Sequence, residues 1–229
     1  MKPLRLLLLA ALTAFPVFAD GVRITFSSDR YSKSDKLPDG WVLKGKLFTA
    51  KPTYEVVYDK DLKTDVLRIR ADRASGTLLY DITGILQKYP IMRWKWRVDS
   101  LPNDADGRVP ERDDQALSVY VGAGRISTNS ISYRWDTDTP KQTRGKASYG
   151  AGMVKVDWIT LRNKEDKVGI WYVDQVNAAE DLKRICGGKL PDHDVALSIC
   201  SNSQYTRSDI TAEIAYIEFL PLDGSGEKK

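Results

Sequence analysis

The sequence is poor in the residues that most often carry catalysis or bind transition metals. Its 229 residues include one histidine, His193, and two cysteines, Cys186 and Cys200. These three residues do not supply the four ligands of a structural zinc site at the usual spacing. Gly-x-Ser-x-Gly, Gly-x-Gly-x-x-Gly and Walker sequences are all missing. This argues against a Ser-His-Asp hydrolase and against an enzyme with a nucleotide cofactor.

Long runs of one residue class are also missing beyond the N-terminus. No five basic residues follow one another, and no later apolar run approaches the ~20 residues of a membrane-spanning helix. The formal net charge of +4 falls to +2 once residues 1–19, with Lys2 and Arg5, are set aside. We therefore expect no nucleic-acid partner and no transmembrane segment in the mature chain.

The first nineteen residues have the pattern of a secretory signal peptide. Lys2 and Arg5 form a positive region, residues 6–12 are apolar, and Ala19 completes a cleavage site. A retained N-terminal anchor is the alternative. We expect cleavage after Ala19 and a periplasmic or secreted mature protein.

The two cysteines are expected to form a disulfide. An oxidising compartment favours pairing, and Cys186 and Cys200 are the only candidates. Such a bridge would stabilise the fold by roughly 3 kcal/mol in the chain-entropy interpretation. A metal site that includes His193 is the alternative.

Alternation of apolar and polar residues predicts strands along nearly the whole chain. The segments are rich in β-branched and aromatic residues and are separated by Gly, Pro, Asp, Ser or Asn. About ten strands are expected: 22–26, 54–58, 66–70, 91–98, 117–121, 131–135, 154–161, 168–173, 195–199 and 212–220. This pattern indicates an all-β fold, an antiparallel two-sheet β-sandwich of the jelly-roll type. We expect a single domain over residues 20–220 and a flexible tail over 221–229.

One short helix is expected over residues 178–186. Asn177 and Glu180 have the spacing of a capping box, and the Gly187-Gly188 pair can end the helix. A shorter helical turn is expected over 82–87.

The segment 91–98 places two tryptophans on one face of a strand and three cations on the other. Trp94 and Trp96 alternate with Arg93, Lys95 and Arg97. The tryptophans could stack on sugar rings, but their apolar neighbours favour a place in the core. The cations are then solvated and suited to an anionic ligand.

The polar residues of this strand and of other predicted strands are expected to form one polar sheet face. We expect it to hold acidic sugars through arginine contacts and a stacking ring. Its members are Arg68, Arg70, Arg93, Lys95, Arg97, Tyr120, Arg134 and Lys155.

Two loops are candidates for further polar sites. The first, 103–114, contains five carboxylates and ends in Asp113 and Asp114, which could bind Ca²⁺. It lacks EF-hand spacing, and the preferred alternative is a solvated turn whose acids bind the next strand or nearby arginines. The second loop is expected from Asp136 to Tyr149, and its length favours a functional role.

Several of these motifs together resemble the DUF3047 family of exported bacterial proteins. The resemblance covers most of the mature chain. It rests on Leu37-Pro-Asp-Gly-Trp41, Tyr54-Glu-Val, Val66-Leu-Arg68, Ala74-Ser-Gly76, Pro90-Ile-Met-Arg-Trp-Lys-Trp96, Asp113-Asp114, Val119-Tyr-Val121, Tyr133-Arg-Trp135 and Ala215-Tyr-Ile-Glu-Phe219. It implies a β-sandwich similar to jelly-roll carbohydrate-binding modules, with no established activity.

The leading functional hypothesis is an exported, non-catalytic domain that binds a glycan or another cell-envelope polymer. The first alternative is a polysaccharide-degrading enzyme on the same fold. It requires two or more carboxylates, or a tyrosine and an arginine, that converge in one groove. The candidate carboxylates are Asp113, Asp114, Asp136 and Asp157. The second alternative is a structural or protein-interaction role in the envelope.

Overall fold

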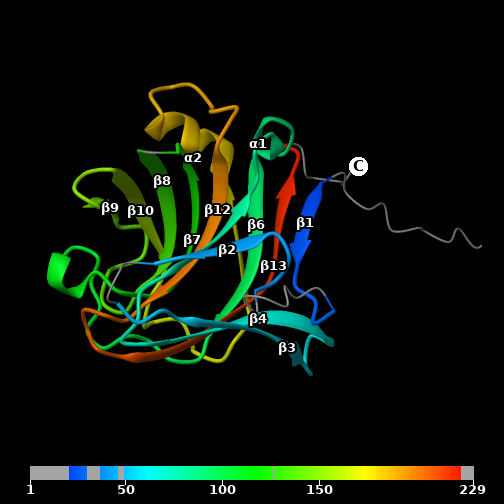
Figure 1. Ribbon diagram of the computed structural model, residues 1–229. Coiled ribbons are helices and arrows are strands. Elements are labelled where there is room, and N and C mark those ends of the chain that lie inside the picture. Colours follow the sequence, from blue (N-terminus) through cyan, green and yellow to red (C-terminus); the bar gives the residue numbers. More distant parts are fainter. Residues whose placement is uncertain (1–20, 30–36, 46–48, 126, 223–229) are drawn as a thin grey trace, which may run out of the picture.

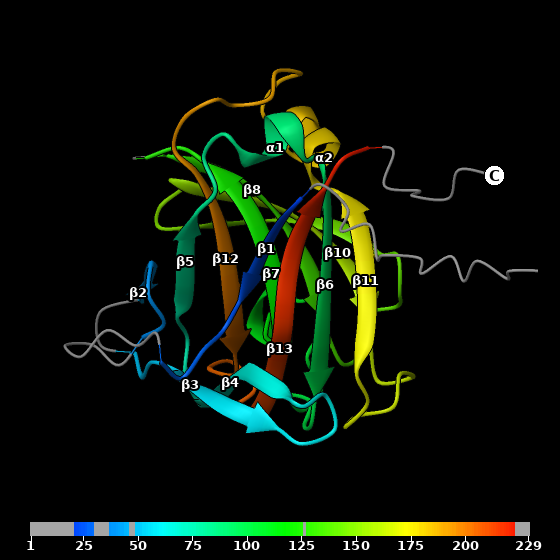
Figure 2. The same ribbon diagram turned by 90° about the vertical axis from the view of Figure 1, so that its right-hand side faces the viewer.

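The computed structural model describes residues 21–29, 37–45, 49–125 and 127–222. Within these ranges the chain forms thirteen strands in two facing sheets, with two α-helices at one end of the sandwich (Figures 1 and 2). The expected all-β sandwich is therefore confirmed. The signal peptide and residues 223–229 of the expected tail lie outside the described residues.

The six-stranded sheet is antiparallel throughout, with the strand order β11-β6-β13-β4-β3 and with β1 beside the C-terminal half of β13. Its strands are β1 (Val22–Thr25), β3 (Thr53–Asp59), β4 (Thr64–Asp72), β6 (Ile91–Val98), β11 (Tyr172–Asn177) and β13 (Asp209–Leu220). The long strand β13 lies at the centre of this sheet. One of its edges pairs with β6, and the other pairs with β4 along its N-terminal part and with β1 along its C-terminal part.

The seven-stranded sheet has the order β2-β5-β12-β7-β8-β10-β9. Its strands are β2 (Trp41–Lys44), β5 (Thr77–Asp81), β7 (Gln115–Ala123), β8 (Thr128–Trp135), β9 (Arg144–Tyr149), β10 (Val154–Arg162) and β12 (Val195–Asn202). One pair departs from the expected antiparallel arrangement, because β10 runs parallel to β8. The chain reaches the edge strand β9 first and returns as β10, which lies between β9 and β8.

The core lies between the two sheets and is rich in aromatic rings. Trp94 and Trp96 of β6 are both fully buried, as the alternation predicts. Trp94 contacts the ring of Tyr133 at a centroid distance of 5.6 Å, and Trp96 meets Trp135 edge to face at 5.5 Å. These contacts join the inner face of one sheet to that of the other. The tryptophans therefore do not form a sugar-stacking platform.

The helices close one end of this core. The helix α2 (Ala178–Ile185) begins at Asn177, whose side chain accepts a hydrogen bond from the Glu180 backbone N–H at 3.0 Å, as the capping box predicts. Leu182 of α2 is fully buried. The short helix α1 (Ile85–Lys88) overlaps the expected turn over 82–87 but begins three residues later and ends one residue later. A 3₁₀ turn, η1, covers Pro110–Arg112.

Three strands were not predicted from the sequence and one was misplaced. The strands β2, β5 and β9 are additional, and β9 occupies half of the loop that was expected to run from Asp136 to Tyr149. The strand expected over 168–173 begins at Tyr172 instead. Val168 and Ile170 are about half exposed in the turn before it, so their apolar character did not indicate burial.

The expected disulfide is wrong, because both cysteines are free. Cys186 ends α2 and packs against the core between the sheets. Cys200 follows the inward-facing Ile199 on β12, so its side chain lies on the outer face of the seven-stranded sheet. Its sulfur is 2.9 Å from the Thr77 hydroxyl, within hydrogen-bond distance. The two thiols therefore lie on opposite sides of the seven-stranded sheet.

None of the helices in the described ranges is long and apolar enough to cross a membrane.

Candidate functional site

The polar face expected from the sequence is divided between two surfaces, so the prediction of one continuous face is wrong. The residues Arg68, Arg70, Arg93, Lys95 and Arg97 lie on the outer face of the six-stranded sheet, opposite the core tryptophans. The other three belong to the seven-stranded sheet. Of these, Tyr120 and Arg134 face outward from that sheet, whereas Lys155 alternates to the other side of β10.

Carboxylates balance most of the cations on the six-stranded sheet. Three ion pairs hold this surface together: Arg68–Glu213 at 2.8 Å, Arg93–Glu218 at 2.6 Å and Arg97–Asp59 at 3.1 Å. Arg97 also pairs with Glu213, which is fully buried. The arrangement stabilises the sheet and leaves little uncompensated positive charge for an anionic ligand.

A second polar group lies on the outer face of the seven-stranded sheet. We call it the outer-face cluster and define it as Asp113, Tyr120, Ser132, Arg134 and Tyr149. The strand register explains its position, since Tyr120 of β7 lies opposite Ser132 of β8, and Arg134 follows two residues later on the same face. The structure thus brings together three of the residues predicted from the sequence, Asp113, Tyr120 and Arg134.

Arg134 is the centre of the outer-face cluster and is fully buried. Its Nη1 donates to Asp113 Oδ1 at 2.6 Å, and its guanidinium lies over the Trp158 ring at 4.8 Å. A loop covers it from outside, because a Cβ added to Gly107 would lie 2.9 Å from Arg134 Nη1. The Nη2 atom has no hydrogen-bond partner among the described residues.

Tyr149 joins the edge of the sheet to this centre. Its hydroxyl donates to Asp113 Oδ2, although β10 and β8 lie between β9 and β7 in the sheet. The edge strand and the loop before β7 therefore approach each other over the outer face. Tyr149 and Tyr120 both remain half-buried, so part of each residue is accessible to solvent.

Burial keeps the tyrosines of the cluster in their neutral form. It raises the pKa of Tyr120 to about 12, with a smaller contribution from Cys200. Burial likewise raises the pKa of Tyr149 far above its usual value, and Tyr120 and Asp113 add to this effect. At neutral pH both phenols can donate and accept hydrogen bonds, whereas neither is a ready nucleophile.

The four carboxylates considered for catalysis do not converge on one groove. Asp113 and Asp136 lie near Arg134, and both are buried. Asp114 accepts hydrogen bonds from the Thr206 backbone N–H and hydroxyl at 2.7 and 2.8 Å. Asp157 belongs to the other side of β10. Among these four, the structure brings only Asp113 and Asp136 close to a common partner.

Three of the five carboxylates of the acidic loop bind protein groups. Asp106 pairs with Arg108 at 2.5 Å, Asp113 with Arg134, and Asp114 with Thr206. Within the described ranges, no three His, Cys, Asp or Glu side chains are placed to hold a metal ion. The preferred alternative, in which the acids bind arginines and the next part of the chain, describes this loop better.

Sequence reasoning missed Tyr149, Trp158 and Gly145 as parts of this region. The Trp158 ring lies directly over Gly145, where an added Cβ would approach it to 2.1 Å. The alternation of Gly145, Ala147 and Tyr149 with charged or polar residues is a strand signal. The strand was not predicted because the residues before it, 136–143, have the polar composition of a loop.

The sequence was also compared with known protein families. The model of the family described as "Protein of unknown function (DUF3047)" matches residues 39–218, which is most of the chain. The chain belongs to the DUF3047 family. No curated protein matches this DUF3047 member.

Solved structures resemble the DUF3047 chain only distantly. One is the xyloglucanase domain of NopAA, a type three effector from Sinorhizobium fredii, with 10% identity, a TM-score of 0.43, and coverage of 78% of this chain and 92% of that one. Another is the catalytic domain of Humicola grisea Cel12A, with 9% identity, a TM-score of 0.41, and coverage of 79% and 92%. A third is TmCBM61 bound to β-1,4-galactotriose, with 9% identity, a TM-score of 0.34, and coverage of 86% and 99%.

Proposed function

We propose that the protein is an exported, non-catalytic domain, formed by residues 20–220, that binds a glycan of the cell envelope. The ligand lies on the outer face of the seven-stranded sheet, beside Tyr120 and the Tyr149–Asp113 contact. The observation that carries this proposal is the pair of half-buried tyrosines held over one buried Arg134–Asp113 ion pair.

The surface around Tyr120 has the composition that a sugar ring requires. Small side chains lie beside it on the same face, namely Gly122, Ser130, Ser132 and Ser198. They leave room for a ring to approach the sheet, while the tyrosines supply an apolar ring face and neutral hydroxyls.

The environment of the carboxylates supports a non-catalytic role. Asp113 is bound by both Arg134 and Tyr149, and Asp136 is fully buried and accepts a hydrogen bond from the Thr160 hydroxyl at 2.9 Å. A glycosidase needs one carboxyl group to protonate the leaving oxygen and a second to act on the sugar or on water. Acids engaged in this way are poorly placed to reach a substrate.

Binding to Tyr120 is tested by calorimetry of the mature chain with cellohexaose, xylohexaose, chitin oligosaccharides, peptidoglycan fragments and oligogalacturonate. We expect one class to bind, Tyr120→Ala to abolish that binding, and Tyr120→Phe to weaken it. The matched control is Tyr58→Ala, since Tyr58 is an exposed tyrosine on the other sheet. Equal loss in the control, or unchanged binding by Tyr120→Ala with retained melting temperature, would overturn the proposed site.

Export is tested separately from binding. We expect the protein recovered from the periplasm or medium of an expressing bacterium to begin at Asp20, as read by N-terminal sequencing. Full-length protein retained in the cytoplasm, with Met1 intact, would contradict the proposed signal peptide.

One observation favours a second candidate, a polysaccharide-degrading enzyme. Burial raises the pKa of Asp136 to about 6, against the opposing effects of Arg134 and of hydrogen bonds from Thr139 and Thr160. A carboxylic acid with a raised pKa close to a second carboxylate is the usual arrangement of a glycosidase acid and its partner. Release of reducing ends from any bound glycan, abolished by Asp136→Asn, would establish this activity in place of simple binding.

A further inference from the structure

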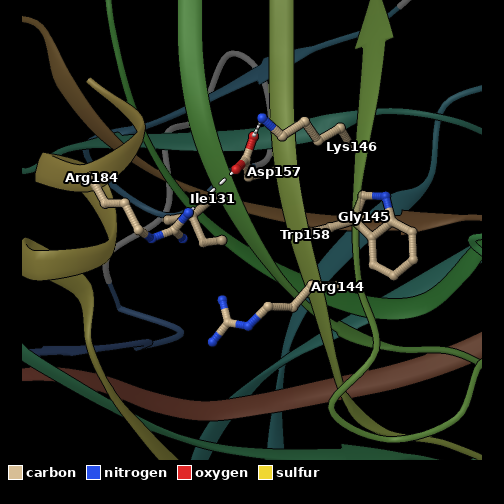
Figure 3. A pocket seen from close by; sticks show the side chains of 7 residues that line it. All are labelled: Ile131, Arg144, Gly145, Lys146, Asp157, Trp158 and Arg184. Carbon is tan, nitrogen blue, oxygen red and sulfur yellow. Dashed lines mark hydrogen bonds and ion pairs between the residues drawn. The ribbon is translucent and has the colours of Figure 1, made fainter. Parts of the chain in front are cut away.

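An open pocket of about 260 Å³ lies between the β9–β10 edge of the seven-stranded sheet and the helix α2. Figure 3 shows the charged side chains around it, with dashed lines from Asp157 to Lys146 and to Arg184. Its lining residues are Ile131, Arg144, Gly145, Lys146, Asp157, Trp158 and Arg184. Three of them are cations and one is a carboxylate, so positive charge predominates in the pocket.

The strand geometry explains why cations gather here. Arg144 and Lys146 alternate with Gly145 along β9 and so share one face of the edge strand. The absence of a side chain at Gly145 lets the Trp158 ring pack flat on the opposite face. This contact fixes β9 against β10 and holds both cations toward the pocket.

Arg184 reaches the same pocket from α2 and is held there by a short chain of contacts. Its Nη2 donates to Asp181 Oδ1 at 3.2 Å, and the other oxygen of Asp181 accepts from the Tyr133 hydroxyl at 2.9 Å. Tyr133 is a core residue of β8. The guanidinium is therefore positioned by groups that are themselves fixed, which lowers the entropy cost of binding a ligand.

The carboxylate in the pocket does not balance these cations. Asp157 lies 4.0 Å from Lys146 and 3.5 Å from Arg184, whereas the Arg93–Glu218 pair on the other sheet closes to 2.6 Å. Among the described residues, Arg144 has no ion pair. The pocket thus contains Arg144, which has no ion pair among the described residues, Lys146, which is loosely paired with Asp157, and Arg184, which is shared between Asp157 and Asp181 at 3.5 and 3.2 Å.

We propose that this pocket is a binding site for an oxyanion, a carboxylate or phosphate group, whose oxygens are held by Arg144 and Arg184 with Lys146 at the rim. Guanidinium groups bind both kinds of oxyanion through paired hydrogen bonds. The site is separate from the proposed glycan surface, because Arg144 and Lys146 lie on one face of β9 and Tyr149 lies on the other. The oxyanion can be carried by an acidic sugar or by a phosphorylated compound.

The test is NMR titration of the ¹⁵N-labelled mature chain with inorganic phosphate, with D-galacturonate and, as a neutral control, with galactose. We expect the Gly145 amide and the Arg144 side-chain signals to shift with phosphate, galacturonate or both, and not with galactose. Tighter binding of phosphate would indicate that a phosphorylated compound supplies the oxyanion, and tighter binding of galacturonate would indicate an acidic sugar. The absence of saturable shifts with either anion would overturn the proposal.

Two substitutions give opposite expected changes, which a general loss of structure could not produce. Arg144→Gln should weaken binding about tenfold, and Asp157→Asn should strengthen it about threefold because the competing carboxylate is removed. Lys95→Gln, which removes one cation from the outer face of the other sheet, is the matched control and should change nothing. Binding that is unchanged in Arg144→Gln, or weakened in Asp157→Asn, would contradict the proposal. Because none of these variants alters Tyr120, failure here leaves the glycan proposal intact, and the reverse also holds.

Discussion

Arg134 and Asp113 form an ion pair at 2.6 Å in which the arginine side chain is fully buried and the aspartate nearly so. Asp113 comes from the loop before β7 and Arg134 from β8, so the pair attaches this loop to the sheet. Tyr149 of β9 binds the same carboxylate. One carboxyl group thus connects three separate segments around the proposed glycan surface.

Breaking this pair should greatly lower the stability of the fold, because removal of either partner leaves the other charged, buried and unpaired. We expect Asp113→Asn and Arg134→Met each to lower the free energy of unfolding by about 3–5 kcal/mol. Urea denaturation measures the change. The control is Arg73→Ala, which breaks the exposed Arg73–Asp72 pair and should leave the midpoint within experimental error. A small effect of Asp113→Asn would show that Arg134 finds another partner.

The two core tryptophans should respond differently to loss of the indole nitrogen. Trp96 Nε1 donates to Asp174 Oδ2 at 2.7 Å, whereas Trp94 Nε1 has no hydrogen-bond partner in the part of the chain that the structure describes. Both alanine variants should lose about 3–5 kcal/mol of stability, since both rings are core. Trp96→Phe should in addition cost about 1–3 kcal/mol more than Trp94→Phe, because it leaves Asp174 with one donor fewer. Equal melting temperatures of the two phenylalanine variants would contradict this.

The buried Asp136 should make stability depend on pH. Its pKa is raised to about 6 by burial, so between about pH 4 and pH 6 the folded protein holds a proton that the unfolded chain releases. Its contribution to stability is therefore present below pH 4 and is lost as the pH rises through 6, by about 3 kcal/mol in all. Asp136→Asn removes this dependence. In thermal unfolding across pH 4–7, the melting temperature of Asp136→Asn should therefore rise relative to that of the wild type as the pH increases. Melting temperatures that change in parallel with pH would contradict the raised pKa of Asp136.

The free thiols predict a labelling pattern. Burial raises the pKa of Cys186 moderately and that of Cys200 to about 12, and the thiolate is the reactive form. In the native protein a maleimide should therefore label Cys186 before Cys200. After unfolding without a reductant, mass spectrometry should find two labels per chain. An unfolded chain that takes up no label would establish the disulfide after all.

Alternation along the chain predicted most strands and the buried tryptophans, because local sequence determines which side chains face inward. It could not distinguish the two outer faces of a sandwich. Arg93 and Arg134 both alternate with core residues, yet they belong to different sheets and lie on opposite surfaces. Strand order depends on contacts between distant segments, and the predicted polar face failed for this reason.

The same limit applies to the disulfide and to the missed edge strand. Cys186 and Cys200 are close in sequence, but a full sheet lies between their side chains. In β9 one face of the strand carries Arg144 and Lys146 to solvent, and the other carries glycine and alanine against β10. Its sequence therefore lacks the β-branched residues that usually reveal a strand.

The insertion of β10 between β8 and β9 has a consequence for motion. The strands β9 and β10 form a hairpin at the edge of the sheet. Strand β10 pairs with β8, and β9 is attached further only through side chains, such as the contact of Tyr149 with Asp113. Such a unit can detach as a whole and expose its amides to solvent while the core stays folded. Both proposed sites take side chains from this hairpin, Tyr149 on one side and Arg144 on the other. A ligand at either site would therefore slow amide exchange throughout the hairpin, and the two ligands would favour each other's binding without sharing a contact.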